Sequence, residues 1–339
     1  MKYAVVLFNL GGPDALSAVK PFLFNLFYDP AILPLPNPFR WLLAKFISGR
    51  RTPYAQNIYK KIGGKSPIRE ETLKQVQALE KVLKPHGKYK VFYSMRYWKP
   101  FAEDVANEVK KYNPDKIILL PLYPQFSTTT TESSLQQWHK VAALVGLTCP
   151  TQAICCYYEH PAFINAYAEL LSKEYFKALK FGQPKILFSA HGIPMNRVEN
   201  GDPYQYQVER TVAGIVKQLG VKNLDYTICY QSKVGRLKWL EPAADAEIIQ
   251  ASQAGKVVVV APISFVSEHS ETLVELDMDY RELAMQNGCR KYLRVPTVRV
   301  HKQFIECLKQ LCLAYTQQSC GFCSDGTCKG QQLNALFKG

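Results

Sequence analysis

Two apolar stretches of this sequence run into ionisable side chains. His191 directly follows residues 186–190, and His269 and Glu271 come shortly after residues 256–263. A neutral imidazole suits first-row transition metals, and both imidazole and carboxylate groups accept protons. These residues therefore indicate a site for proton transfer, for metal binding or for both.

Structural roles are the alternative at each of these positions. A single histidine after a strand is more often structural than catalytic. A glutamate in the first turn of a helix is favoured by the helix dipole alone, and we expect this solvated role for Glu268. For Glu271 and its neighbour His269, the catalytic and structural interpretations both stay open. Glu275 and Asp279 follow Glu271 at helical spacing.

Three cysteines near the C-terminus have the spacing of a metal site. Cys320, Cys323 and Cys328 follow a C-x2-C-x4-C pattern. Thiolates at such a spacing hold zinc or an iron–sulfur cluster. Ten cysteines among 339 residues are too sparse for a disulfide scaffold, so we expect reduced thiols.

The charge of the chain favours an anionic partner. It carries 42 Lys and Arg against 28 Asp and Glu, a formal net charge of +14. This surplus suits nucleic acid, an anionic membrane surface or a ligand that bears carboxylates. The cations are scattered and form no basic helix, which argues against nucleic acid. A hydrophobic fraction of 47% excludes a disordered chain.

We expect neither a secretory nor a membrane-spanning segment. Residues 1–8 lack a small-residue cleavage site and predict a first strand. Residues 21–47 are apolar but contain charges and several prolines, so they offer no continuous apolar run of about twenty residues. The expectation is a cytoplasmic protein that can associate peripherally with the inner face of an anionic membrane.

Short β-rich runs alternate with helical patterns along the whole chain, which predicts an α/β fold with parallel sheets. The expected strands are residues 3–9, 89–96, 116–123, 185–190, 226–230 and 256–263. The expected helices are residues 70–83, 102–111, 162–177, 206–218 and 272–286.

The two halves of this pattern resemble each other. Residues 116–124 and 256–264 are each a buried strand that ends in proline and precedes a polar loop. We therefore predict a duplicated fold, with a cleft between the halves and ligand groups at the carboxyl ends of strands. The expected parts are an N-terminal half (1–150), a C-terminal half (151–312) and a cysteine-containing tail (313–339).

Two further segments are unusual. Residues 9–13 and 63–67 contain Gly-Gly, but neither has the spacing of a dinucleotide-binding or P-loop motif. Aromatic residues are dense between Phe22 and Phe46, where prolines interrupt the chain. Part of this segment is expected to form an exposed apolar lip for a flat hydrophobic ligand or a membrane.

Ten short motifs occur in one order along the chain. They are Asn9-Leu10-Gly11-Gly12-Pro13, Arg51-Thr52-Pro53, Gly63-Gly64-x-Ser66-Pro67, Arg96-Tyr97, Tyr123-Pro124-Gln125, Ser189-Ala190-His191-x-x-Pro194, Gly201-Asp202-Pro203-Tyr204, Gln231-Ser232-Lys233-Val234-Gly235, Trp239-Leu240 and His269-x-Glu271-Thr272-Leu273-x-Glu275-Leu276-Asp277. In this order they resemble the ferrochelatase family, which inserts ferrous iron into a porphyrin to complete haem.

The resemblance implies two Rossmann-like chelatase halves with the porphyrin between them. His191 matches the histidine that binds iron or takes pyrrole protons, and Glu271 matches the carboxylate that faces it across the macrocycle. Glu268 matches part of a polar trail that leads away from this carboxylate. The implied porphyrin-binding residues are Leu10, Tyr59, Arg96, Tyr97, Trp239, Phe265, His269 and Glu275. Since metal insertion displaces two N–H protons, a neutral histidine and a carboxylate meet the chemical need.

The resemblance also implies a [2Fe–2S] cluster on the C-terminal cysteines. The fourth ligand of animal relatives falls on Thr128 here, so another cysteine must replace it. Cys155 and Cys156 are the leading candidates, ahead of Cys149 and Cys312. Adjacent residues of a strand point to opposite faces, so at most one of the pair suits this role.

The sequence is compatible with three functions. The first is insertion of Fe2+ into protoporphyrin IX, giving protohaem. The second is a related chelatase that acts on coproporphyrin III, or inserts Co2+ or Ni2+ into another tetrapyrrole. The third is a basic nucleic-acid-binding protein with a zinc knuckle, which the scattered cations disfavour. The sequence predicts no oligomeric state.

Overall fold

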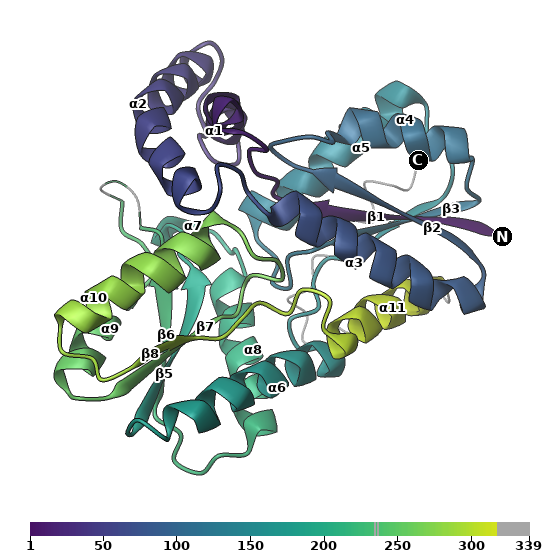
Figure 1. Ribbon diagram of the computed structural model, residues 1–339. Helices are drawn as coiled ribbons and strands as arrows, with labels where there is room; N and C mark the ends of the chain where they lie inside the picture. Colours follow the sequence, from purple (N-terminus) through teal and green to yellow (C-terminus); the bar gives the residue numbers. More distant parts are fainter. Residues whose placement is uncertain (234, 236, 317–339) are drawn as a thin grey trace. The chain divides into compact units, whose positions relative to one another are not determined.

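The computed structural model describes residues 1–233, 235 and 237–316 (Figure 1). The chain divides into two compact units. Unit 1 comprises residues 1–156 and the described residues from Leu308 onward, and unit 2 comprises residues 157–307. Each unit contains one four-stranded sheet in which every pair is parallel. The expected α/β fold with two parallel sheets is confirmed. The cysteines expected to hold a cluster, Cys320, Cys323 and Cys328, lie outside the described residues.

The sheet of unit 1 has the strand order β2-β1-β3-β4. Its strands are β1 (Lys2–Asn9), β2 (Lys88–Met95), β3 (Lys116–Pro121) and β4 (Thr151–Ala153). The central strand β1 is buried from Ala4 to Asn9, as its unbroken apolar run requires when helices cover both faces.

Unit 1 also contains several helices, some of which cover the faces of this sheet. They are α1 (Val19–Tyr28), α2 (Phe39–Lys61), α3 (Ile68–Leu83), α4 (Ala102–Tyr112) and α5 (Ser133–Val145), with short turns η1 (Leu16–Ala18), η2 (Lys84–His86) and the π-helix η3 (Thr128–Glu132). The connection from β1 to β2 contains α3, and the connection from β2 to β3 contains α4. These two connections run in opposite directions across the sheet. Right-handed crossovers then place these helices on opposite faces, as Figure 1 shows.

The sheet of unit 2 repeats this order as β6-β5-β7-β8. Its strands are β5 (Pro184–His191), β6 (Tyr226–Gln231), β7 (Val257–Pro262) and β8 (Tyr292–Arg294). Its helices are α6 (Pro161–Ala178), α7 (Met195–Glu199), α8 (Tyr204–Leu219), α9 (Ala244–Gln253), the π-helix η4 (Glu271–Asp279), α10 (Tyr280–Gln286) and α11 (Lys302–Thr316), which runs past the division at residue 307. In both sheets the first strand along the chain lies between the second and the third, so the predicted duplication is confirmed.

Several elements differ from the sequence-based expectation. The edge strands β4 and β8 have three residues each, too few for a recognisable β pattern. The prolines at 30, 34, 36 and 38 lie between α1 and α2, so the predicted break in this segment is confirmed, whereas α2 itself continues through Pro53. The expected helix at 272–286 begins as a π-helix, and the polar loop after β3 contains another. Among the described residues, no helix combines the length and apolarity needed to cross a membrane.

Candidate active site

The sheet of unit 2 brings His191 and Glu271 into contact. His191 is the last residue of β5, and Glu271 begins the π-helix that follows β7. Because β5 and β7 are parallel neighbours, their carboxyl ends lie at the same edge of the sheet. The imidazole Nδ1 of His191 lies 2.9 Å from Oε2 of Glu271.

This contact changes one expectation from the sequence. Glu271 was expected to face His191 across a macrocycle, but in this structure the two side chains form a direct pair. His269, the partner expected for Glu271, is more distant, with Nε2 4.0 Å from Oε1. Glu271 is the first residue of the π-helix, and from there its carboxylate reaches the end of β5.

The two groups change each other's protonation. Burial lowers the pKa of the His191 imidazole, but the charge and hydrogen bond of Glu271 and the charge of Glu275 raise it by more, so the net pKa is above 6.5. Burial raises the pKa of the Glu271 carboxyl, but His191, His269 and Ser232 lower it to about 2. Each group thus stabilises the charged form of the other, whereas the sequence suggested a neutral imidazole.

A second carboxylate lies beside this pair. Glu275 follows Glu271 on the π-helix, and both carboxylates reach Ser232 just after β6. Burial and the charge of Glu271 raise the pKa of the Glu275 carboxyl. One carboxyl of unusually low pKa and one of raised pKa therefore share a site, an arrangement typical of proton-transfer chemistry.

Two aromatic side chains lie near the end of β5. The Phe265 ring lies edge-on to the imidazole, with 6.4 Å between centroids, and 4.7 Å from the ring of His269. Trp239 packs over Gly192, where a Cβ atom would meet the indole at 3.3 Å. Burial lowers the pKa of His269, despite the nearby carboxylates, so this imidazole is neutral at pH 7. These predicted residues thus lie around one site in unit 2.

Glu268 differs from its expected role. It was expected to be a solvated residue of a first turn, but it is 7% exposed. Its carboxylate accepts hydrogen bonds from Arg294 Nη1 at 3.1 and 3.2 Å and from the backbone N–H of Thr297 at 3.1 Å. Arg294 ends β8, so the ion pair ties the loop after β7 to the edge strand. The solvated interpretation of Glu268 was wrong.

In unit 1, Arg96 and Tyr97 follow β2 and share one buried carboxylate. Asp29 Oδ2 accepts hydrogen bonds from Arg96 Nη2 at 2.8 Å, from Tyr97 Oη at 2.8 Å and from Ser133 Oγ at 2.6 Å. Arg96 Nε also donates to Ser133 Oγ at 2.8 Å. Asp29 and Ser133 were not predicted as partners of Arg96, because they lie 67 and 37 positions away from it in the sequence.

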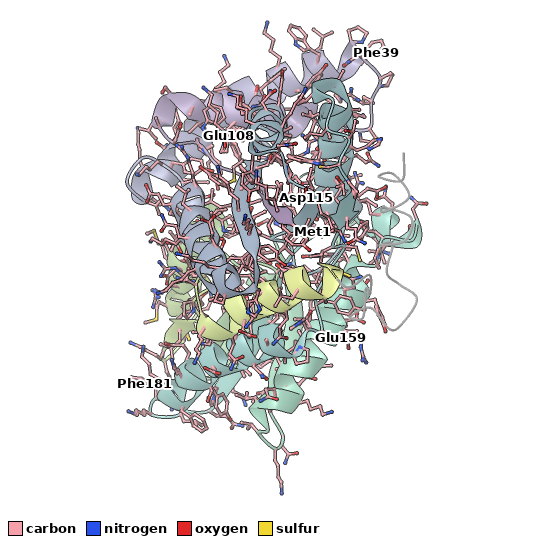
Figure 2. The ribbon with its side chains drawn as sticks, turned by 90° about the vertical axis from the view of Figure 1, so that its right-hand side faces the viewer. Met1, Phe39, Glu108, Asp115, Glu159 and Phe181 are labelled. Atoms are coloured by element: carbon pink, nitrogen blue, oxygen red, sulfur yellow. The ribbon has the colours of Figure 1, made fainter. Side chains whose placement is uncertain are left out.

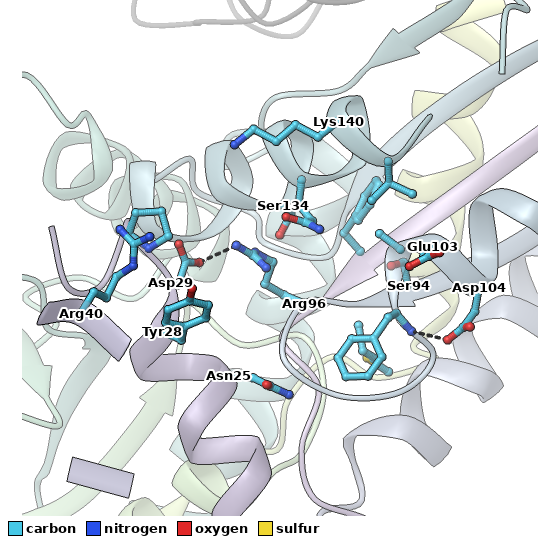
Figure 3. Close-up of a pocket in the computed structure, with 17 residues that line it drawn as sticks. Asn25, Tyr28, Asp29, Arg40, Ser94, Arg96, Glu103, Asp104, Ser134 and Lys140 are labelled. Atoms are coloured by element: carbon cyan, nitrogen blue, oxygen red, sulfur yellow. Dashed lines mark hydrogen bonds and ion pairs between the residues drawn. The ribbon is translucent and has the colours of Figure 1, made fainter. Parts of the chain in front are cut away.

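The Asp29–Arg96 pair lines a cavity of about 550 Å³ in unit 1 (Figure 3). Arg40 and Lys140 line it beside this pair, and the first turn of α4 contributes Asp104. The Asp104 carboxylate accepts from the Phe101 N–H at 3.2 Å, which caps α4. The cavity lining includes neither His191 nor Glu271.

Tyr97 and two other predicted residues of unit 1 belong to an apolar cluster. Tyr59 and Tyr97 are 6% and 1% exposed, and Leu10 packs against the same group. The cluster joins the loop after β1 to α1 and α2. Their predicted contact with a porphyrin stays a prediction.

The candidate fourth cluster ligands lie just past a strand. Since β4 ends at Ala153, Cys155 and Cys156 are not alternating strand residues. Their Sγ atoms are 3.2 Å apart and both side chains are buried, so the expectation that they point to opposite faces was wrong. Burial raises the pKa of the Cys149 and Cys312 thiols, which disfavours them as thiolate ligands.

Among the described residues, no group of three or more His, Cys, Asp or Glu side chains is arranged to hold a metal ion. The site residues that sequence reasoning missed in unit 2 are Ser232 and Gln231. Gln231 Nε2 donates to Glu271 at 3.4 Å, and its Oε1 accepts from the Ser189 hydroxyl at 2.7 Å. Both residues stand in the motif 231–235, whose position after an apolar strand was the available signal.

Solved structures of chelatases share this fold. SirB from Bacillus subtilis with Fe3+ matches with a TM-score of 0.54 at 13% identity, over 95% of this chain and all of that chain. SirB from Bacillus subtilis subspecies spizizenii in complex with cobalt matches with a TM-score of 0.53 at 10% identity, over 95% of this chain and 99% of that one. Identities this low establish the fold alone.

Sequence comparison identifies the family. The Ferrochelatase family model matches residues 2–315. A ferrochelatase from Wolbachia sp. subsp. Drosophila simulans (strain wRi) is 55% identical over 315 residues, which cover 92% of this chain and 99% of the relative. A ferrochelatase from Pelagibacter ubique (strain HTCC1062) is 48% identical over 314 residues, which cover 92% of this chain and 90% of the relative. The chain therefore belongs to the ferrochelatase family and is a metal chelatase.

Proposed function

We propose that this protein inserts Fe2+ into protoporphyrin IX to form protohaem, with His191 and Glu271 as the catalytic pair. The observation that carries the proposal is their 2.9 Å contact at the carboxyl ends of β5 and β7, in a chain of the ferrochelatase family. Phe265 and Trp239 offer aromatic surfaces beside this pair, as a flat macrocycle requires.

The chemistry follows from competition between protons and metal. Insertion releases two pyrrole N–H protons, so the site must bind a cation and accept protons. The Glu271 carboxylate, with a pKa of about 2, is ionised throughout the neutral range and can contact Fe2+. The charge of an arriving cation disfavours the imidazolium form of His191, which then loses its proton to solvent. As a neutral base, His191 can take one pyrrole proton, and the neighbouring Glu275 carboxylate can take the other.

The remaining predicted residues of the porphyrin site fall into two groups. His269 and Glu275 contact or neighbour the catalytic pair in unit 2. Leu10, Tyr59, Arg96 and Tyr97 belong to unit 1, where Arg96 is 16% exposed and lines the cavity. We propose that Arg96 attracts a propionate, although half of its guanidinium is already engaged by Asp29 and Ser133.

A direct assay tests the function. Iron insertion is measured with protoporphyrin IX and with coproporphyrin III, and with Co2+ and Ni2+ as competing metals. We expect turnover with Fe2+ and protoporphyrin, and loss of nearly all activity in His191→Ala and Glu271→Gln with porphyrin binding retained. The matched controls His86→Ala and Glu282→Gln change exposed residues and should keep full activity. Full activity in both site variants refutes the assignment, and a preference for coproporphyrin or another metal favours the related chelatases.

We further propose a [2Fe–2S] cluster held by Cys320, Cys323 and Cys328 with Cys156 or Cys155 as fourth ligand. What supports the fourth ligand is a pair of buried sulfur atoms 3.2 Å apart in unit 1. Bound there, the cluster would supply one-electron chemistry or structural support. Iron and sulfide analysis of anaerobically purified Cys323→Ser, Cys156→Ser and Cys155→Ser tests this. We expect loss of the cluster in Cys323→Ser and in one of the other two, and an unchanged spectrum in all three refutes it.

Peripheral membrane association at the cytoplasmic face is also proposed. Exposed apolar side chains gather between residues 35 and 46, where Phe39, Leu42 and Phe46 are 65%, 54% and 63% exposed, and Figure 2 shows Phe39 projecting from the surface. Phe22, expected in this lip, is instead buried. Lys45 lies over the exposed Trp41 ring, a pairing suited to an anionic interface. Binding to phosphatidylglycerol vesicles should fall in Phe39→Ser/Phe46→Ser and persist in the control Phe176→Ser, which changes another exposed ring.

A further inference from the structure

Ser232 connects the two carboxylates of the site. Its hydroxyl Oγ lies 2.6 Å from Glu275 Oε2 and 3.4 Å from Glu271 Oε2, and its backbone N–H donates to Glu275 Oε1 at 3.0 Å. One residue therefore donates to both oxygens of Glu275 and also reaches Glu271. The Tyr280 hydroxyl adds a third donor to Glu275 at 3.1 Å.

The backbone of Ser232 is held in an uncommon conformation. Its φ angle is +64°, in the left-handed region that non-glycine residues rarely adopt. Asparagine tolerates this region, as at Asn113 and Asn223 in this chain, but serine has less local compensation for it. Such strain persists only where surrounding contacts over-determine it, and it concentrates at functional sites. Here the contacts that hold Ser232 include its two hydrogen bonds to Glu275 and the approach of its hydroxyl to Glu271.

The hydrogen bonds of Ser232 to the two glutamates also oppose an electrostatic repulsion between them. Glu271 and Glu275 lie on one side of the π-helix, and two nearby carboxylates repel each other unless donors stand between them. Without the Ser232 hydroxyl, Glu275 keeps the backbone N–H and Tyr280 but loses its shortest hydrogen bond. Fewer donors then hold its carboxylate against the repulsion from Glu271.

We propose that Ser232 is a positioning residue of the metal-insertion reaction, which fixes the Glu275 carboxylate beside Glu271 and His191. The inference rests on the proposed function. The placed carboxylate adds a second negative group close to the His191–Glu271 pair, where it can receive a proton released during insertion or attract the incoming cation. Ser232 acts through Glu275 and has no catalytic role of its own.

Two substitutions separate the hydroxyl from the backbone. Ser232→Ala removes the hydroxyl and keeps the strained backbone, whereas Ser232→Gly removes the hydroxyl and relieves the strain. Because glycine adopts the left-handed region freely, Ser232→Gly should fold even where Ser232→Ala does not. Ser17→Ala, at an exposed serine of unit 1, is the control.

The proposal is tested by measuring kcat and KM for iron insertion in both variants and by determining the crystal structure of Ser232→Gly. We expect kcat to fall about 10- to 100-fold in both Ser232 variants, the usual effect of removing a group that orients a metal-site carboxylate. KM for the porphyrin should stay unchanged, and the Glu275 carboxylate should leave its position in the structure. Full kcat in Ser232→Gly overturns the proposal. A raised porphyrin KM with unchanged kcat also overturns it, since Ser232 would then contact the porphyrin directly.

The crystal structure separates the two proposals. An inactive wild-type enzyme defeats the proposed function, whatever Ser232 does. An unmoved Glu275 carboxylate in Ser232→Gly defeats the positioning role, even if the wild-type enzyme inserts iron.

Discussion

Replacing Asp29 by asparagine should strongly destabilise unit 1. The Asp29 carboxylate is 2% exposed, and its Oδ2 accepts three hydrogen bonds while Oδ1 accepts one from the Ala31 N–H at 2.8 Å. Asparagine has a single acceptor oxygen. In Asp29→Asn, either Ala31 or the group formed by Arg96, Tyr97 and Ser133 therefore meets an N–H donor instead of an acceptor.

The size of the effect follows from the burial of the pair. Removing one partner of a buried ion pair costs about 3–5 kcal/mol, because the other charge stays buried. Arg96 is 16% exposed and borders the cavity, so water can partly solvate its charge. The destabilisation should therefore lie at the lower end of this range. We expect Asp29→Asn to lose about 3 kcal/mol of unfolding free energy, which is a large share of the roughly 5–15 kcal/mol typical of proteins.

Urea unfolding followed by circular dichroism measures this loss. The control Asp115→Asn removes a carboxylate that is 55% exposed and should change the unfolding free energy by less than about 1 kcal/mol. In Asp29→Asn/Arg96→Met the buried cation is absent, so the double variant should be more stable than the sum of the single losses predicts. A loss below about 1 kcal/mol in Asp29→Asn, or strict additivity in the double variant, would refute this account.

Two further predictions concern unit 2. The pKa of Glu271 is lowered to about 2 from 4.5, so its stabilisation is complete above pH 4.5 and disappears as the pH falls through 2. The pKa of His191 is raised from 6.5, so the same pair is fully formed below pH 6.5 and weakens as the pH rises past the folded value. The unfolding free energy of the wild type minus that of Glu271→Gln should therefore be greatest between pH 4.5 and 6.5, and a difference that does not vary with pH contradicts the assignment. Glu268→Gln should lose about 2 kcal/mol in urea unfolding, less than Asp29→Asn because Asp277 remains 3.5 Å from Arg294. It should keep a near wild-type kcat, and a large fall in kcat would instead place Glu268 in the polar trail of the site.

Much of the fold could be predicted because it depends on local sequence. The interior strands are continuous apolar runs, such as 257–260, and these runs are visible without tertiary information. The edge strands β4 and β8 could not be found in this way, since pairing with β3 and β7, and not their own composition, makes them strands. The π-helices were missed for a similar reason: their sequences, such as Thr128–Glu132, differ little from those of a loop or an α-helix.

The site shows the same division. The placement of His191 and Glu271 could be predicted, because both follow apolar strands of a parallel sheet and such strand ends meet at one edge. The direct pairing of these two side chains, and the hydrogen bonds that Ser232 makes to the carboxylates, could not be predicted. They depend on side-chain directions in the π-helix and on the left-handed backbone of Ser232. Asp29 could not be predicted for another reason: it is the C-cap residue of α1 and belongs to none of the sequence motifs.

The duplicated sheets explain why the two units place polar residues at equivalent points. In each unit, a polar residue just after the second strand contacts the region of a π-helix that follows the third strand. In unit 1 this residue is Arg96, whose Nε donates to Ser133 at the end of η3. In unit 2 it is Ser232, which donates to the carboxylates of η4.

The chemistry of these equivalent points has diverged. Unit 1 places a cation there and neutralises it with Asp29, so this region is an ion pair beside a cavity. Unit 2 places a small hydroxyl there, which leaves two carboxylates and His191 without a resident Lys or Arg partner among the contacts of the described residues. Because an Arg or Lys at position 232 would neutralise the carboxylates that we propose as the Fe2+ contacts, Ser232→Lys should abolish insertion of the metal while Ser232→Gly only slows it. Equal activity of these two variants, measured with the same iron-insertion assay, would contradict the view that unit 2 holds the metal because its strand end carries no fixed cation.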